Sequence, residues 1–299
     1  MVSTNITKIF FRGNEIVALY KGDTLIFKKS PGGGSTTKPT GVYKIKGTVT
    51  KKSGYTQFNL TYNDGQMVNV KVNKDLTFET DLQEPLTNAN AMFQGMSYLE
   101  TLDLNGLDTS QVTNMSNMFS QSNYLKDIKL SSFDTSIVTD MSLMFNGCLY
   151  LKSLDLTNFN TSKVTNMFGM FANCSILKSL DLTNFNTSKV TNIALMFYGC
   201  NMLSDLYLNF DMPQLSNNTD GPFGRCDSLT NVVGKFDNYS NNLWFTDSPL
   251  TAQSAMVFIN GLATVTEKRT LALSRTTYDS LTPEQIAIAT SKGWTVIRN

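Results

Sequence analysis

Residues 144–167 read MFNGCLYLKSLDLTNFNTSKVTNM, and related stretches return through the middle of the chain every 26 residues. One column of this repeat is always phenylalanine, at Phe93, Phe119, Phe145, Phe171, Phe197 and Phe223. A leucine column keeps the same interval, at Leu99, Leu125, Leu151, Leu177, Leu203 and Leu229. A fixed period of this length is typical of solenoids, in which each repeat forms one coil stacked on its neighbours. The repeat therefore predicts a solenoid over residues 86–241.

Each coil is predicted to contain one strand and one short helix. The LxxLxL segment at 151–156 alternates in the way a strand with one buried face does. The MxxMF segment at 167–171 has the i, i+3, i+4 spacing of one helix face, and Thr165 and Asn166 precede it as N-cap candidates. We therefore expect an α/β solenoid whose strands form a parallel sheet.

The run quoted above resembles the BspA-type leucine-rich repeats of gut and oral bacteria and mycoplasmas. The resemblance covers roughly residues 86–232. It implies a right-handed leucine-rich-repeat solenoid with a parallel sheet. Members of that family are commonly surface proteins that bind host or matrix components, so the resemblance also implies a binding role.

The segments on either side of the repeat predict smaller modules. Residues 1–29 read as a small N-terminal β anchoring module, residues 30–41 as a Gly/Ser/Pro linker, and residues 42–85 as an antiparallel β cap. Residues 242–299 combine two helical patterns with short strands, and Pro283 stands at the start of the second helix. They predict an α/β C-terminal cap that continues the parallel sheet.

Composition narrows the function classes. The chain has no histidine, which removes Ser–His and Cys–His nucleophile pairs and every histidine metal ligand. Stacked aspartates are present, but a shared column gives them similar environments and implies no catalytic pocket. A net charge of +1 gives no electrostatic basis for binding nucleic acid, and no apolar run is long enough to span a membrane. We therefore expect a non-enzymatic protein with no cofactor, metal site, nucleic-acid partner or membrane insertion.

Three further columns of the repeat are predicted to be structural. The cysteines lack a CxxC spacing or a histidine partner, so they are expected to be buried fillers: Cys148, Cys174, Cys200 and Cys226. Methionines at helical spacing predict a buried ladder. An amide column is predicted to satisfy backbone groups at a coil corner: Asn88, Asn114, Asn166 and Asn192, with Asp140 substituting.

The outward positions of the predicted strands are the candidate binding face, because they vary from coil to coil while the inward ones repeat. They are Asp103, Lys129, Asp155, Asp181, Tyr207, Ser153, Ser179 and Asp205. A stack of Asp155 over Asp181 is unfavourable without a cation, a lysine neighbour or a ligand. A solvated face with no ligand is the alternative. Because aromatic content is thin, chiefly Tyr207, the face favours a glycan or another polar ligand over a tight protein hot spot.

The setting is predicted from the two ends of the sequence. The start has neither the basic nor the apolar segment of an export signal, and it resembles short β modules of some phage structural proteins. The C-terminal segment resembles caps of repeats in gut bacterial and phage proteins. These features predict a virion-displayed fibre, tail or capsid-decorating protein, made in the host cytoplasm, that attaches to a host surface protein or glycan. The alternatives are a bacterial cell-surface adhesin and a purely structural virion subunit.

In this prediction the N-terminal module contacts other virion proteins. Self-association into a homo-oligomer is compatible with it.

Overall fold

The structure is a computed structural model of the whole chain. It describes residues 8–12, 15–21, 24–28, 43–51, 57–63, 65–72, 77–82, 85–213, 215–216 and 221–299. The chain divides into two compact units, Met1–Gly41 and Val42–Asn299. The predicted linker at 30–41 lies outside the described residues.

The first unit contains three strands that pair in the antiparallel order β1–β2–β3. These are β1 (Lys8–Arg12), β2 (Glu15–Lys21) and β3 (Thr24–Lys28). Short strands separated by Gly-Asn and Gly-Asp pairs are typical of such a meander. The strands predicted within residues 1–29 are therefore present.

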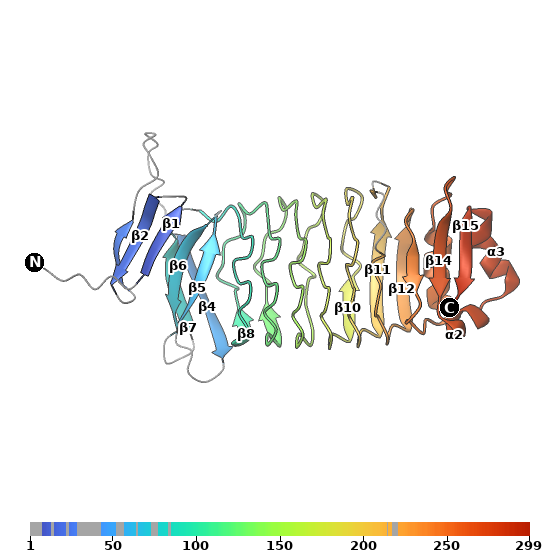
Figure 1. The fold of residues 1–299 in the computed structure, drawn as a ribbon, viewed down its shortest axis with the longest axis horizontal. Coiled ribbons are helices and arrows are strands. Elements are labelled where there is room, and N and C mark those ends of the chain that lie inside the picture. The colour runs from blue at the N-terminus through green and yellow to red at the C-terminus, as the bar shows by residue number, and fades with distance from the viewer. Residues whose placement is uncertain are drawn as a thin grey trace, which may run out of the picture. The chain divides into compact units, whose positions relative to one another are not determined.

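The second unit begins with four strands that cover the start of the repeat (Figure 1). They are β4 (Tyr43–Lys51), β5 (Gln57–Tyr62), β6 (Gln66–Lys71) and β7 (Thr77–Leu82). Strand β4 pairs antiparallel with β7 on one side and with the first solenoid strand, β8 (Leu99–Asp103), on the other. This pairing satisfies the backbone donors and acceptors along the edge of β8, which would otherwise be exposed.

The repeat forms coils stacked along the long axis of the second unit (Figure 1). We number them 1 to 6 from residue 86, so that coil 3 covers residues 138–163 and coil 4 covers residues 164–189. The solenoid strands after β8 are β9 (Asp127–Lys129), β10 (Ser179–Leu182), β11 (Asp205–Asp211) and β12 (Asn231–Asp237). Strands β8 and β9 are parallel, and β10, β11 and β12 form a second parallel set.

The core is a continuous ladder of phenylalanines, one from each coil. All six are at most 1% exposed, and neighbouring rings stack with centroids 5.2 to 5.9 Å apart. The predicted methionine ladder is also buried, with Met144 and Met170 fully enclosed. Close-packed identical side chains bury apolar surface between coils, so each coil depends on its neighbours for a core.

The MxxMF corner is not a helix, and the prediction of an α/β coil is wrong at this point. No helix occurs among the described residues of the solenoid. In coil 2, Asn117 and Gln121 have positive φ angles of 57° and 60°, which interrupt a right-handed helical backbone. Residues with the same property recur at the first of these positions in coils 1, 3, 4 and 5: Ala91, Leu143, Gly169 and Leu195.

Hydrogen bonds at this corner alternate between two directions. The amides of Met115, Asn117 and Phe119 each donate to a carbonyl of coil 3 over 2.9 Å. The intervening amides of Met118 and Ser120 donate three residues back within their own coil. The corner is therefore a series of tight turns that are hydrogen-bonded to the next coil along the solenoid axis. In an α-helix these amides would instead donate to carbonyls four residues back in the same coil.

The asparagine column has the predicted structural role. The side-chain oxygen of Asn114 accepts from the amide of Ser116 at 2.8 Å, and Asp140 accepts from Ser142 at the same distance. Because only the oxygen is used, aspartate can replace asparagine. The column also forms unbroken parallel β-bridges from coil 1 to coil 5: Asn88 to Asn114, Asp140, Asn166 and Asn192.

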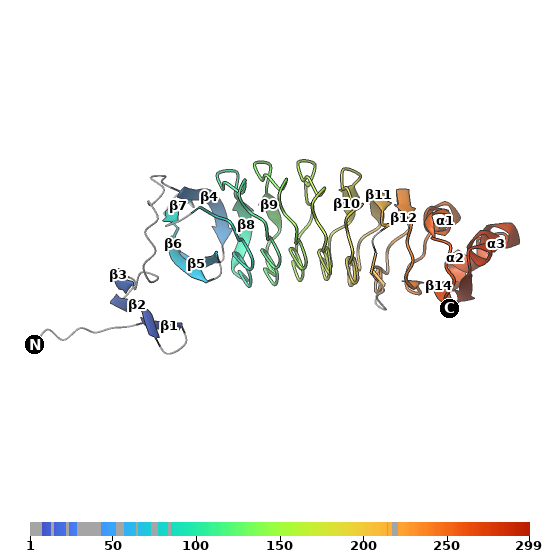
Figure 2. The ribbon, with the colours of Figure 1, turned by 90° about the horizontal axis from the view of Figure 1, so that it is seen from above.

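The C-terminal segment is an α/β module, whose helices gather beyond β12 (Figure 2). Its elements are β13 (Leu243–Phe245), α1 (Ala252–Gly261), β14 (Arg269–Leu273), α2 (Arg275–Asp279), α3 (Pro283–Ser291) and β15 (Trp294–Arg298). Thr282 and Gln285 form a capping box at the start of α3. The strands make a separate parallel sheet, β13–β14–β15, so the prediction that they continue the solenoid sheet is wrong.

Candidate binding face

The strand side of the solenoid is interrupted at coil 3. Among the described residues, 151–156 form no strand, and no strand pairing joins this segment to β9 or β10. A single backbone bond remains at its start, from the amide of Lys152 to the carbonyl of Lys126 at 3.2 Å. Leu154 is only partly buried, whereas its equivalents Leu102 and Leu180 are 2% and 1% exposed. The prediction of a strand in every coil is therefore wrong at coil 3.

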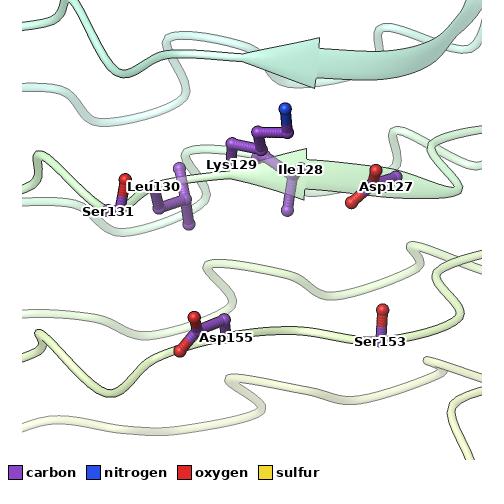
Figure 3. A pocket seen from close by; sticks show the side chains of 7 residues that line it. All are labelled: Asp127, Ile128, Lys129, Leu130, Ser131, Ser153 and Asp155. Atoms are coloured by element: carbon purple, nitrogen blue, oxygen red, sulfur yellow. The ribbon is translucent and has the colours of Figure 1, made fainter.

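A shallow pocket of about 250 Å³ lies where the ladder is interrupted, and we call it the coil 2–3 hollow. Its lining residues are Asp127, Ile128, Lys129, Leu130, Ser131, Ser153 and Asp155. Figure 3 shows the first five along β9 and the residues that follow it, and the last two on the neighbouring segment of coil 3. Ile128 and Leu130 are buried, so the hollow combines an apolar base with polar side chains around it.

Two charged groups of the hollow are held by neighbours. The ammonium of Lys129 lies 3.5 Å from the carboxylate of Asp103 in coil 1. The carboxylate of Asp155 accepts from the amide of Thr157 at 3.0 Å and from its hydroxyl at 2.7 Å. The bond from the backbone amide and, to a smaller extent, the bond from the hydroxyl lower the pKa of Asp155 below its ordinary value. Asp155 therefore stays an acceptor at neutral pH.

The hollow offers donors and acceptors of several kinds within one small volume. Asp127 and Asp155 supply carboxylates, Ser131 and Ser153 supply hydroxyls, and Lys129 supplies an ammonium. Within the part of the chain that the structure describes, no group of three or more His, Cys, Asp or Glu residues could hold a metal ion. The chemistry present is that of hydrogen bonding to a polar ligand.

The structure brings together some of the eight residues predicted for the binding face. Lys129, Ser153 and Asp155 line the hollow, and Asp103 contacts it through the ion pair with Lys129. The other four lie on β10 and β11, where the register pairs Ser179 with Asp205 and Asp181 with Tyr207. None of these four lines the hollow.

Several predicted aspartates also hold turns. Asp181 accepts from the amide and hydroxyl of Thr183 at 2.9 and 2.7 Å, as Asp155 does with Thr157. Asp205 accepts from the hydroxyl of Ser204 and the side-chain amide of Asn231, and these bonds lower its pKa. The aspartates are thus partly structural residues, which the D-x-T spacing of Asp155 and Asp181 could have indicated.

Two lining residues, Asp127 and Ser131, were not among the eight predicted. Both occupy outward positions of coil 2, beside Lys129 in the alternation of the strand. That alternation is the signal that could have included them. The interruption itself has no such signal, because coil 3 keeps every leucine of the LxxLxL pattern.

The cysteine column is buried and does not form part of this face. All four thiols are free and fully enclosed, as predicted. Each also donates to the carbonyl of a phenylalanine in the preceding coil, for example Cys174 to Phe145 at 3.3 Å. Ser122 makes the same bond to Phe93 at 2.8 Å. Burial raises the pKa of Cys148 and of Cys200 to about 12, so these thiols are unreactive near neutral pH.

The fold and this face define a class of protein, a repeat solenoid that is mostly strand and turn with few helices. The family described as "Mycoplasma protein of unknown function, DUF285" matches residues 87–210 and, in an overlapping second match, residues 121–236. Together the matches span about half of the chain. The chain belongs to this family, whose repeats are BspA-like and related to leucine-rich repeats.

No curated protein and no solved structure matches the chain. Among the described residues, no helix is both long enough and apolar enough to cross a membrane.

Proposed function

We propose that this chain is a non-enzymatic binding protein and that the coil 2–3 hollow holds a saccharide of a host surface. The observation that carries the proposal is the presence of five hydrogen-bonding side chains around an apolar base, at the coil where the strand ladder is interrupted. Saccharides present hydroxyl groups that carboxylates, serines and a lysine can bind, and apolar C–H faces that Ile128 and Leu130 can contact. The leucine-rich-repeat character of the solenoid supports the same role, because stacked coils present extended binding surfaces.

The proposed setting is display outside a particle or a cell. The family match, which is described for mycoplasmas, supports a bacterial setting. The cell-surface adhesin is supported by the resemblance of the repeat to BspA-type surface proteins. The bacteriophage virion setting, with strands β1–β3 contacting other virion proteins, depends on the resemblance of the N-terminal and C-terminal segments to segments of phage proteins. The comparisons add no support to it. Particle-assembly genes beside this gene would favour the virion, and a secretion or cell-wall locus would favour the adhesin.

A glycan array probed with the full chain tests the binding role. Glycans that bind are then titrated against the double variant Asp127→Asn with Asp155→Asn. Asparagine keeps the oxygen that Thr157 requires and removes the charge, so the fold is expected to survive while affinity falls about tenfold. Asp181→Asn is the matched control, because Asp181 makes the same turn outside the hollow.

The proposal predicts that the control binds as the wild type does. An array without any saturable ligand would contradict the saccharide role. Equal losses in the two variants would contradict the hollow as the binding site, and would point to the wider face that includes Tyr207.

A further inference from the structure

A column of apolar side chains, one from each of coils 2 to 5, follows the edge of the strand side, and all of them except the half-buried Ile176 are exposed. It consists of Tyr124, Tyr150, Ile176 and Met202, which stand 26 residues apart, with Leu149 beside it. Tyr150 is 46% exposed, Met202 42%, and Tyr124 and Leu149 36% each. Single exposed apolar residues are common, but several of them gathered together, as Tyr124, Leu149 and Tyr150 are, mark an interaction surface.

A row of lysines runs parallel to this column. Coils 2, 3 and 4 read apolar-Leu-Lys at this point, so that a buried leucine separates the two side chains: Lys126, Lys152 and Lys178 follow Tyr124, Tyr150 and Ile176 by two residues. Lys126 pairs with Glu100 at 3.1 Å. Lys152 and Lys178 are exposed and form no ion pair with any residue that the structure describes.

The charge of this strip is opposite to that of the solenoid around it. Residues 86–241 carry 8 Lys and Arg against 13 Asp and Glu, a net charge of −5. Three of the eight basic residues stand in this one row. Apolar side chains bordered by unpaired lysines on an acidic body are complementary to a surface with apolar groups and acidic residues.

The geometry of the rings indicates the class of partner. Tyr124 and Tyr150 stack on one another with centroids 5.5 Å apart and planes inclined by 12°. Their faces are therefore turned toward neighbouring coils, and the ring edges and hydroxyls are outermost. Sugars and nucleobases bind aromatic residues through the ring face, and Tyr124 and Tyr150 each have one face occupied by the other. Protein interfaces are enriched in tyrosine and methionine. The acidic solenoid would also be repelled by an anionic membrane.

We propose that this strip docks a protein partner whose contact surface carries acidic side chains around apolar ones. The proposal does not depend on the coil 2–3 hollow, which lies beside the strip and binds by different residues. Tyr150 is the expected anchor because it is the most exposed member of the column, and Lys152 is the expected charged contact next to it.

The test pans a ribosome-displayed random-peptide library against the immobilised full chain and measures synthetic copies of the enriched peptides by fluorescence anisotropy. The test variant is Tyr150→Ser with Lys152→Glu. The matched control is Tyr150→Phe with Lys163→Glu, which makes the same charge change on an exposed lysine of the same coil but keeps the ring and the strip lysine. Melting curves check that both variants fold.

Enriched peptides are expected to combine Asp or Glu with aromatic or aliphatic residues. Their affinity should fall about tenfold or more in the test variant and less than about twofold in the control. The double variant of the hollow, Asp127→Asn with Asp155→Asn, should bind them as the wild type does, which separates this proposal from the saccharide role.

The proposal is overturned by a library without enrichment, by enriched peptides that lack acidic residues, or by equal affinity for test variant and wild type. Heparin and phosphatidylglycerol vesicles are run in parallel, and tighter, Tyr150-dependent binding to either would show that the partner class is wrong. Sedimentation that shows a dimer of the wild type, lost in the test variant, would show that the occupant is a second copy.

Discussion

The two sides of each coil are held together differently. At the MxxMF corner, parallel bridges run without a break from Asn88 to Asn192, and every second amide bonds to the next coil. On the strand side, the ladder of β8 and β9 ends at coil 3 and pairing resumes at β10. The corner repeats both its residues and its bonds, whereas the strand side repeats its leucines but not its pairing. The hydrogen bonds at the corner therefore hold neighbouring coils together along the solenoid. The residues on the strand side can differ from one coil to the next.

This difference explains where a binding site can arise in a repeat protein. A change in the ladder at the corner would break bonds to both neighbouring coils, and buried unpaired backbone groups are costly. The outward residues of the strands, in contrast, contact solvent and can change without disturbing the phenylalanine ladder. The coil 2–3 hollow and the strip of apolar and lysine side chains both lie on this variable side.

The largest expected effect comes from the shared core of the two sides. Phe171→Ala removes a fully buried ring that stacks on Phe145 and Phe197 at 5.9 Å. The transfer and cavity terms together should lower the free energy of unfolding by about 3–5 kcal/mol in urea titrations. Phe168→Ala is the control, because Phe168 is only partly buried and should cost clearly less. An equal decrease in the free energy of unfolding for the two variants would contradict the burial of the phenylalanine ladder.

The next prediction compares coil 3 with coil 4 directly. Leu154 and Leu180 hold the same column of the repeat, but Leu154 is partly buried and Leu180 is 1% exposed. Leu180→Ala should cost about 2–5 kcal/mol and Leu154→Ala about half as much or less, because less buried surface and a smaller cavity are involved. Equal losses in urea titrations would mean that coil 3 is closed like the others.

A smaller effect is expected from pH. The folded-state pKa of Cys148 is about 12, against 9.0 for an ordinary thiol. The folded state therefore binds more protons than the unfolded state between these values, and stability present below pH 9 is lost as the pH rises toward 12. The loss should be about 1.4 kcal/mol per pH unit for one such thiol. Cys148→Ser, which copies the donor of Ser122, should remove one thiol's share of this slope in unfolding curves recorded from pH 8 upward, while Cys174, Cys200 and Cys226 keep theirs. An unchanged slope would contradict the buried thiol.

Much of the fold could be predicted from the sequence, because the same information is written six times. The 26-residue interval and the Phe, Met and Cys columns identify the buried positions, and the asparagine column identifies the corner. The prediction of a helix at MxxMF was wrong because two tight turns give the same i, i+3, i+4 spacing of buried side chains. The residues that decide between them, such as Asn117 and Leu143, reveal their positive φ angles only in the stacked structure.

The candidate site was less predictable. The alternation of the strands indicates which side chains face outward, and it placed Lys129, Ser153 and Asp155 correctly on that side. The hollow depends instead on a missing set of backbone bonds at 153–156, and the repeat pattern is the same there as in coils that pair. The Tyr-Leu-Lys row is visible in the sequence, but only exposure values show that the tyrosines lie outside the core.

Hydrogen exchange of the backbone amides tests the interruption at coil 3 most directly. Deuterium uptake is followed by mass spectrometry in peptides that cover 151–156 and 177–182 of the same native protein. The open ladder predicts that amides of 153–156 exchange faster than those of β10, while amides of the corner at 141–145 stay as protected as those at 167–171. Equal protection of 151–156 and 177–182 would show that the ladder is continuous, and the hollow would then not exist.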